Sequence, residues 1–205
     1  MNYGEYMRFF KENSYDIVKL YINQFGITIF SLMLYFSASI VSDVDWTLTL
    51  YLLVSMFSTL FLYTLVYFAA WEFGAKDRIR IDAGRMTYNR YKGLYLGLFA
   101  AVPNFVLAIL SILGKGIYLL SGIGFFDVLF AIPNVLLRFS SAMYMGILKY
   151  LFNPVSAVSM DISFLWQSVG FLVFTALCAF VAHFGYYMGN NCYHIFDLFR
   201  AKKEK

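Results

Sequence analysis

Long stretches without any charged residue are the feature that most constrains the fold of this chain. Residues 20–41, 48–70, 93–113 and 164–187 contain no Asp, Glu, Lys or Arg. A helix needs about 20 apolar residues to cross the hydrocarbon core of a bilayer, which is about 30 Å thick. Each of these stretches is therefore expected to be a membrane-spanning helix.

The composition excludes an ordinary soluble domain. Of the 205 residues, 61% are hydrophobic and 14% are charged, whereas soluble domains contain roughly 45–50% apolar and about 25% charged residues. A chain of this size cannot hide so much apolar surface from water. We therefore expect an all-α, polytopic integral membrane protein that folds as a helical bundle.

The stretch 117–158 allows two interpretations. It can form two spans, 117–137 and 139–158, which turn at Arg138. It can instead form one span that is bounded by its own charged residues, with Arg138 buried inside it. The first interpretation gives six crossings in total, and the second gives five.

The distribution of basic residues favours an even number of crossings. Lys and Arg collect on the cytoplasmic side of membrane proteins. Six of them lie in 72–92, four in 188–205 and three in 1–19, whereas the connections 42–47 and 152–163 contain none. Both termini are therefore expected in the cytoplasm. Six crossings satisfy this condition, as do four crossings plus a re-entrant hairpin, whereas five would leave the basic tail outside; we expect six.

These expectations define three parts of the chain. Residues 1–19 form a cytoplasmic or interfacial segment, residues 20–187 a single transmembrane domain, and residues 188–205 a basic cytoplasmic tail. The sequence has no Asn-x-Ser/Thr acceptor for N-glycosylation, which agrees with a bacterial plasma membrane.

The connection between the second and third spans has a pattern of its own. Residues 78–81 alternate basic and apolar side chains, and Asp82, Ala83 and Gly84 are typical of a turn. A period of two is that of a β-strand. The sequence therefore predicts a short cytoplasmic β-hairpin or turn over 76–90.

Three charged residues are candidates for ligand binding or ion coupling. Asp127 lies 11 residues before Arg138, and Lys149 lies 11 residues after it. If the chain turns at Arg138, antiparallel helices place both residues ~16 Å from that turn, near the bilayer midplane. A charge there is costly, so the two are expected to pair or to line a wet cavity. If 127–149 is a single span, both are ordinary flanking charges.

Seven charged residues of the cytoplasmic connection form a second candidate site. They are Arg78, Arg80, Arg85, Arg90, Lys92, Asp77 and Asp82. Basic side chains at a membrane face attract anionic lipid headgroups, by about 1 kcal/mol each, and the same surface could dock a partner subunit. With its two carboxylates the cluster could also hold a metal and a phosphate. The simpler interpretation is a topology signal that also binds lipid weakly.

Sequence motifs for catalysis are missing. The chain has no Gly-x-Ser-x-Gly elbow, no phosphate-binding Gly-Lys-Ser/Thr loop and no intramembrane His–Glu metalloprotease pattern. It also has no set of metal ligands at the usual spacing and no aromatic–basic motif for nucleic acid. We therefore expect no catalytic residue, no bound metal or cofactor, and no nucleic-acid partner.

The function that fits these expectations best is non-enzymatic. The chain would be a small-solute transport protein, or the membrane subunit of a transport complex whose partner membrane or ATPase subunits dock at the cytoplasmic connection. This hypothesis is an analogy at the level of the fold. One alternative is a membrane-embedded enzyme that acts on a phosphorylated lipid at the cytoplasmic face, with arginines binding phosphate and Asp77 or Asp82 binding a metal. Another is a structural or regulatory membrane protein.

Overall fold

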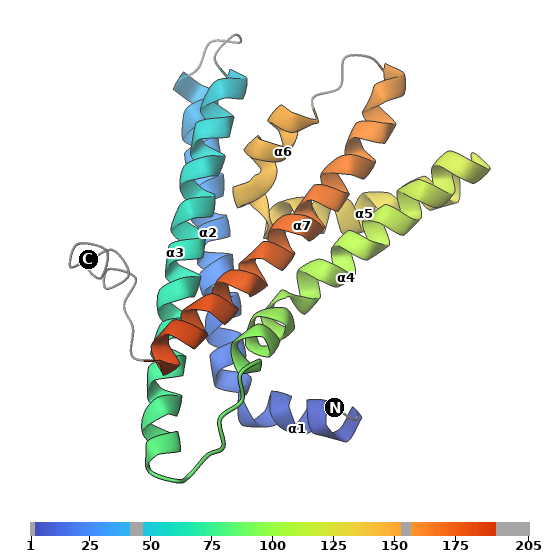
Figure 1. The fold of residues 1–205 in the computed structure, drawn as a ribbon. Helices are drawn as coiled ribbons and strands as arrows, with labels where there is room; N and C mark the ends of the chain where they lie inside the picture. Colours follow the sequence, from blue (N-terminus) through green and yellow to red (C-terminus); the bar gives the residue numbers. More distant parts are fainter. Residues whose placement is uncertain (1–2, 42–46, 153–156, 192–205) are drawn as a thin grey trace, which may run out of the picture. The chain divides into compact units, whose positions relative to one another are not determined.

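The computed structural model describes residues 3–41, 47–152 and 157–191, and its regular structure is entirely helical (Figure 1). In chain order the elements are α1 (Tyr3–Glu12), α2 (Ser14–Val41), α3 (Thr47–Asp82), α4 (Lys92–Ser121), α5 (Gly124–Ser140), the 3-10 turn η1 (Ala142–Tyr144), α6 (Met145–Leu151) and α7 (Ala157–Asn190). No strand occurs among the described residues. The expected all-α fold is confirmed.

The chain divides into two compact units. Unit 1 contains Met1–Asn23, Tyr63–Ala101 and Leu177–Lys205, and unit 2 contains Gln24–Leu62 and Val102–Ala176. The helices α2, α3, α4 and α7 contribute residues to both units, whereas α5, η1 and α6 belong to unit 2. The stretch that the sequence left ambiguous therefore lies entirely in unit 2.

Four helices are long and apolar enough to cross a membrane. Their spans are Ser14–Ile40, Leu48–Asp82, Lys92–Ser121 and Ile162–Asn190, which correspond to the four charge-free stretches of the sequence. A bent pair formed by α5 and η1–α6 brings the number to five if the pair counts as one span. The helices therefore point to a membrane location, but the expected six crossings are not confirmed in the described residues.

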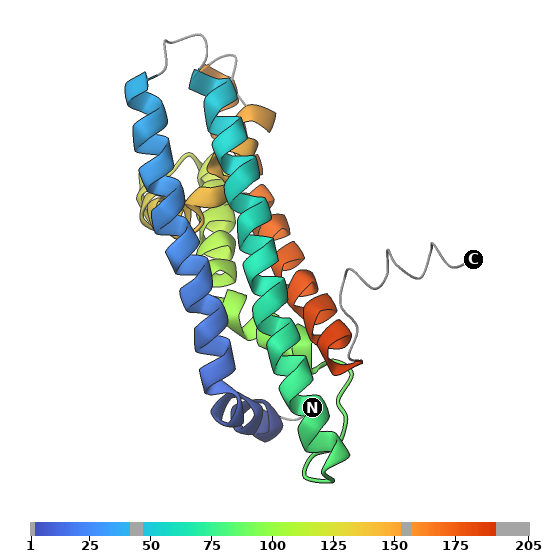
Figure 2. The same ribbon diagram turned by 90° about the vertical axis from the view of Figure 1, so that its left-hand side faces the viewer.

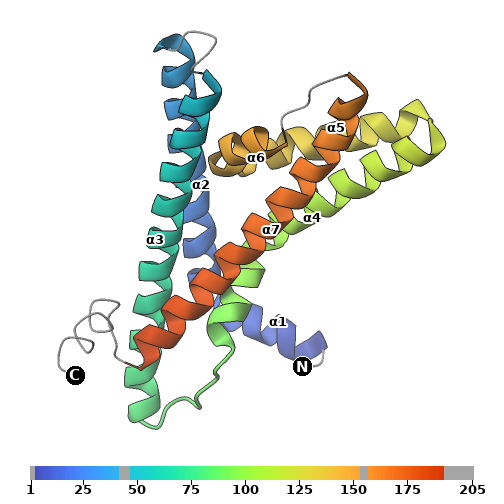
Figure 3. The same cartoon turned by 45° about the horizontal axis from the view of Figure 1, so that its top comes forward.

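The chain after α4 does not fold as two antiparallel spans. The helix α4 ends at Ser121, and the next residue, Gly122, has a φ of 67°, which suits glycine. The next helix, α5, has 17 residues and α6 only 7, so α6 is ~10 Å long and cannot cross a bilayer alone. The segments Gly124–Ser140 and Ala142–Leu151 meet at 85°. The bend between α5 and α6 can be followed in Figure 1, whereas the two segments look nearly in line from the direction of Figure 3. This arrangement agrees with five crossings, or with four plus a re-entrant segment.

The expected β-hairpin at 76–90 is wrong, and the alternative of a turn is confirmed. The helix α3 continues to Asp82, and the chain turns at Gly84, where φ is 69°. Side chains four residues apart meet on a helix surface, and Arg78 Nε lies 3.0 Å from Asp82 Oδ2. Such pairs favour a helix over the strand that the alternating pattern suggested.

Aromatic contacts join the helices within each unit. In unit 2, α2 and α3 lie side by side (Figure 2), and the ring centroid of Phe30 lies 6.4 Å from that of Phe57 and 6.3 Å from that of Phe61. In unit 1, Phe9 of α1 stacks on Phe99 of α4 with centroids 5.8 Å apart. Ring pairs at such distances stabilise helix packing beyond the area that they bury.

Candidate functional site

A break in a helix is the most distinctive feature of unit 2. The helix α5 ends at Ser140, and Ser141 has φ −126° and ψ 31°, outside the helical range. The chain then resumes as η1 and α6 at 85° to α5. A break of this kind frees backbone carbonyl oxygens, which need new donors when water is excluded.

Hydroxyl groups from two other helices bind the freed carbonyl oxygens. The Thr28 hydroxyl of α2 donates to the Ser140 carbonyl oxygen at 2.8 Å. From α3, Ser55 Oγ donates to the Met143 oxygen at 2.5 Å, and Thr59 Oγ1 lies 3.2 Å from the same atom. All three hydroxyl-bearing residues are buried. The break is thus held by specific polar contacts in an apolar surrounding, and it is a built part of the fold.

Arg138 lies in the last turn of α5, just before this break. Its Nε donates to Asn134 Oδ1 at 2.5 Å, and its Nη2 donates to Gln167 Oε1 of α7 at 2.6 Å. The guanidinium carbon lies 5.1 Å from the ring centroid of Phe164. Two buried amides and one aromatic ring therefore fix the guanidinium in place.

The charge of Arg138 has no carboxylate partner within ion-pair distance in the part of the chain that the structure describes. The amide oxygens of Asn134 and Gln167 are neutral and occupy two of the five N–H donors of the guanidinium. Arg138 and Asn134 also line an open pocket of about 290 Å³, together with Phe164. Asn134 and Gln167 thus hold two guanidinium donors at the wall of this pocket, and none of the described carboxylates neutralises the charge.

Asp127 forms its ion pair with a residue that the sequence reasoning missed. Lys115 Nζ lies 3.0 Å from Asp127 Oδ1 and 4.6 and 5.0 Å from the ring centroids of Tyr118 and Phe130. The Lys115 side chain is 4% exposed, whereas that of Asp127 is 50% exposed. Sequence reasoning placed Lys115 in a short connection, but α4 continues past it, and this carries the lysine into the packed interior of unit 2.

The expected pairing of Asp127 with Lys149 rests on a hairpin that does not form. Because α5 and α6 meet at 85°, Asp127 and Lys149 are not on antiparallel neighbours. Lys149 is an exposed residue of α6, and its Nζ lies 5.4 Å from the ring centroid of Tyr51. Of the three candidates in this region, Asp127 pairs with Lys115, whereas Arg138 and Lys149 form no ion pair with any carboxylate that the structure describes.

Two members of the predicted cytoplasmic cluster are buried in unit 1. Asp77 and Lys92 are 4% and 6% exposed at the side chain, and Lys92 Nζ lies 2.7 Å from Asp77 Oδ2. The hydroxyl of Tyr186 donates to the same oxygen at 3.0 Å, and Arg80 Nη1 lies 3.4 Å from Asp77 Oδ1. Burial therefore takes Asp77 and Lys92 away from the lipid headgroups that we expected them to meet.

The other members of the cluster are exposed: Arg78, Arg80, Arg85, Arg90 and Asp82. Asp82 is already paired with Arg78 within α3. In the described residues no group of three or more His, Cys, Asp or Glu side chains is placed to hold a metal ion. The exposed part of the predicted cluster therefore consists mainly of arginines, and its described carboxylates do not form a metal site.

No protein-family model, no curated protein and no solved structure matches this chain. A function for it therefore has to come from the residues and contacts described above.

Proposed function

We propose that this chain is a membrane transport protein, or the membrane subunit of a transport complex, and that it binds a small anion at Arg138. The observation that carries the proposal is the guanidinium of Arg138, which Asn134 and Gln167 hold beside a helix break without a carboxylate partner among the described residues. In this proposal the lipid bilayer surrounds the apolar helices.

A charge among apolar helices is costly, and such residues usually serve a substrate or ion path. A purely structural arginine would be expected to have a carboxylate partner, as Lys92 and Lys115 have. An arginine that instead stacks on a ring and bonds neutral amides attracts an anion more strongly than a paired one. A solute anion would supply the counter-ion that Arg138 lacks among the described residues.

The break between α5 and α6 supports the same proposal. Many transporters form their solute sites where membrane helices are interrupted, because the interruption exposes backbone groups within the membrane. This support is an analogy at the level of the fold. The polar groups around Ser140 and Met143 lie just after Arg138 in the chain. A solute bound at Arg138 would therefore lie beside the helix break as well as beside a positive charge.

The geometry weighs against an enzyme that uses Asp77 or Asp82 to bind a metal. Asp77 already interacts with Lys92, Arg80 and the Tyr186 hydroxyl, and Asp82 with Arg78. A metal would have to displace these cations. The exposed Arg85 and Arg90, which form neither of these ion pairs, would bind anionic headgroups or dock a partner subunit such as an ATPase, and neither role needs a metal.

Anion binding can be measured on the full chain purified in a non-ionic detergent. Thermal unfolding is followed with acetate, glutamate, phosphate, sulfate and chloride at constant ionic strength. A ligand at 100 times its Kd stabilises the folded state by about 2.7 kcal/mol, which is roughly 5–11 °C for a chain of this length. We expect such a shift with at least one anion, and its loss in Arg138→Gln.

Two further variants make this test specific. Asn134→Asp keeps the guanidinium but supplies a carboxylate next to it, so it should abolish the anion-dependent shift. Arg8→Gln removes the same charge from an exposed pair in α1 and should leave the shift unchanged. Absence of a shift with every anion, or an equal shift in Arg138→Gln, would refute anion binding at this residue.

Transport itself is tested with proteoliposomes. Electrical currents that follow an anion concentration jump would support a chain that transports alone. Binding without currents, together with an ATPase that co-purifies from native membranes, would support the subunit. Anion binding with neither currents nor a co-purifying ATPase would indicate a sensor and would refute the transport proposal.

A further inference from the structure

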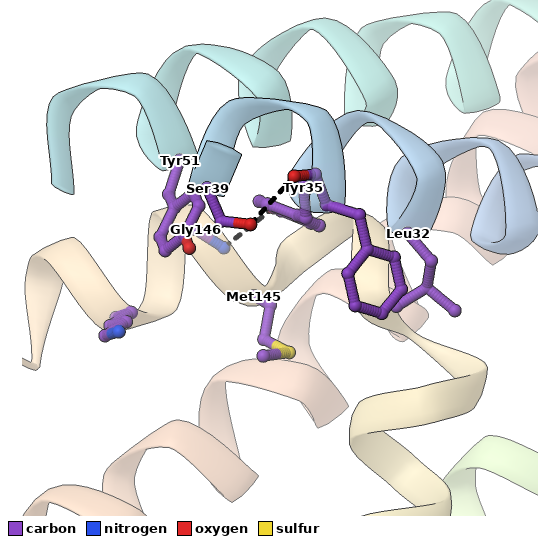
Figure 4. Close-up of a pocket in the computed structure, with 8 residues that line it drawn as sticks. Leu32, Tyr35, Ser39, Tyr51, Met145 and Gly146 are labelled. Carbon is purple, nitrogen blue, oxygen red and sulfur yellow. Dashed lines mark hydrogen bonds between the residues drawn. The ribbon is translucent and has the colours of Figure 1, made fainter. Parts of the chain in front are cut away.

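A second pocket of unit 2, about 320 Å³ in volume, lies between α2, α3 and α6. In Figure 4, Leu32 and Tyr35 come from α2, Tyr51 from α3, and Met145 from α6. This volume is at the lower end of the range for small-molecule sites, about 300–1,000 Å³. The pocket can therefore hold a compact group or a single chain.

Most polar groups in the wall of this pocket are already bonded. The backbone N–H of Gly146 donates to the Tyr35 hydroxyl at 3.0 Å (Figure 4), which fixes α6 against α2. The hydroxyl of Ser39 donates to the Phe36 carbonyl oxygen at 2.7 Å. The ring of Tyr35 meets that of Tyr51 edge to face, with centroids 5.4 Å apart. The wall therefore presents mainly rings and aliphatic groups to a ligand.

Lys149 supplies the charge of this pocket. Its Nζ lies 5.4 Å from the centroid of the Tyr51 ring, and in the described part of the chain no carboxylate lies within ion-pair distance of it. A cation–π contact contributes only about 0.5–1 kcal/mol at an exposed site, so it does not replace a counter-ion. The ammonium group thus remains able to bind an anion at the edge of an apolar pocket.

We propose that this pocket binds a single-chain amphipathic anion, a long-chain carboxylate. The carboxylate would pair with Lys149, and the alkyl chain would pack on Leu32, Phe36 and Met145, which line the same pocket. A small polar anion would leave these apolar groups unused, and a neutral lipid would leave the ammonium group unpaired. A phospholipid with two chains needs more volume than the pocket offers. This site is separate from that of Arg138.

The test is native mass spectrometry of the full chain released from detergent in the presence of palmitate. We expect one bound palmitate, and an affinity for the neutral analogue hexadecanol at least tenfold weaker. Lys149→Met should weaken palmitate binding at least tenfold, and Lys149→Arg should retain it. Lys11→Met is the matched control, because it removes one exposed lysine of α1 and should change nothing.

A second variant tests the pocket without touching the cation. Leu32→Trp fills the apolar space while Lys149 stays in place, and it should also weaken palmitate binding at least tenfold. Far-ultraviolet circular dichroism checks that each variant is folded. Equal binding of palmitate and hexadecanol, unchanged binding in folded Lys149→Met, or a preference for phosphatidylglycerol that palmitate cannot displace would each overturn the proposal.

Discussion

Lys92→Met should destabilise unit 1 strongly, because it leaves a buried carboxylate without its main partner. The Lys92 ammonium lies 2.7 Å from Asp77 Oδ2, and both side chains are almost fully buried. Breaking a buried ion pair from one side typically costs about 3–5 kcal/mol. The Tyr186 hydroxyl still donates to Asp77, and Arg80 Nη1 stays 3.4 Å away. The loss should therefore be near the lower end, about 3 kcal/mol, or roughly 6–12 °C in Tm for a chain of this length.

The assay is thermal unfolding of the full chain in one detergent, followed by tryptophan fluorescence. Lys76→Met is the control, because its partner Glu72 is about half exposed and also binds Lys19; such a pair contributes less than about 1 kcal/mol. The double variant Asp77→Leu/Lys92→Met removes both buried charges, and it should recover most of the loss. A Tm of Lys92→Met equal to that of Lys76→Met, or a double variant less stable than Lys92→Met, would refute the reasoning.

Two predictions concern unit 2, and the same unfolding assay checks both. The two ends of the pair between Lys115 and Asp127 differ in burial, so their substitutions should differ. Asp127→Asn removes the carboxylate from a buried lysine and should lower stability by about 3 kcal/mol. Lys115→Met removes the ammonium group from a half-exposed carboxylate and should lower stability by about 1 kcal/mol. Equal losses would contradict this account. The Met143 carbonyl oxygen in the α5–α6 break has two hydroxyl donors, Ser55 and Thr59. Ser55→Ala and Thr59→Val should therefore each lower stability only slightly, because one donor remains. The double variant should lower stability by about 1–3 kcal/mol. Additive effects of the two single variants would argue that the hydroxyls act independently.

The long apolar helices could be predicted from the sequence because their signal is local. A run such as 48–70 has no charged residue and is long enough to cross a bilayer as a helix, so composition alone predicts the helix. The ends of the helices were less predictable. The helix α3 extends twelve residues beyond that run, to Asp82, because charged residues on its surface pair with one another along the helix.

The contacts of the candidate sites could not be predicted, because they join residues far apart in the chain. Thr28 and Ser55 bind carbonyl oxygens that lie 112 and 88 residues away, and nothing in their local sequence indicates this. The same holds for Asp77 and Lys92, which look like surface charges in a basic connection. Only the packing of α3, α4 and α7 in unit 1 shows that both side chains are buried, where the Tyr186 hydroxyl donates to Asp77.

The basic residues that stabilise the fold differ from the candidate binding residues in whether a carboxylate neutralises them. Lys92 and Lys115 are the most buried cations among the described residues, and each has a carboxylate within 3.0 Å; removing their partners should lower stability. Arg138 and Lys149 line pockets, and no carboxylate of the described residues forms an ion pair with either. Stability alone does not explain why a chain with so few charged residues holds these two without a carboxylate partner among the residues that the structure describes. The anionic ligands proposed for these two sites would explain it, because a ligand supplies the opposite charge only when it is bound.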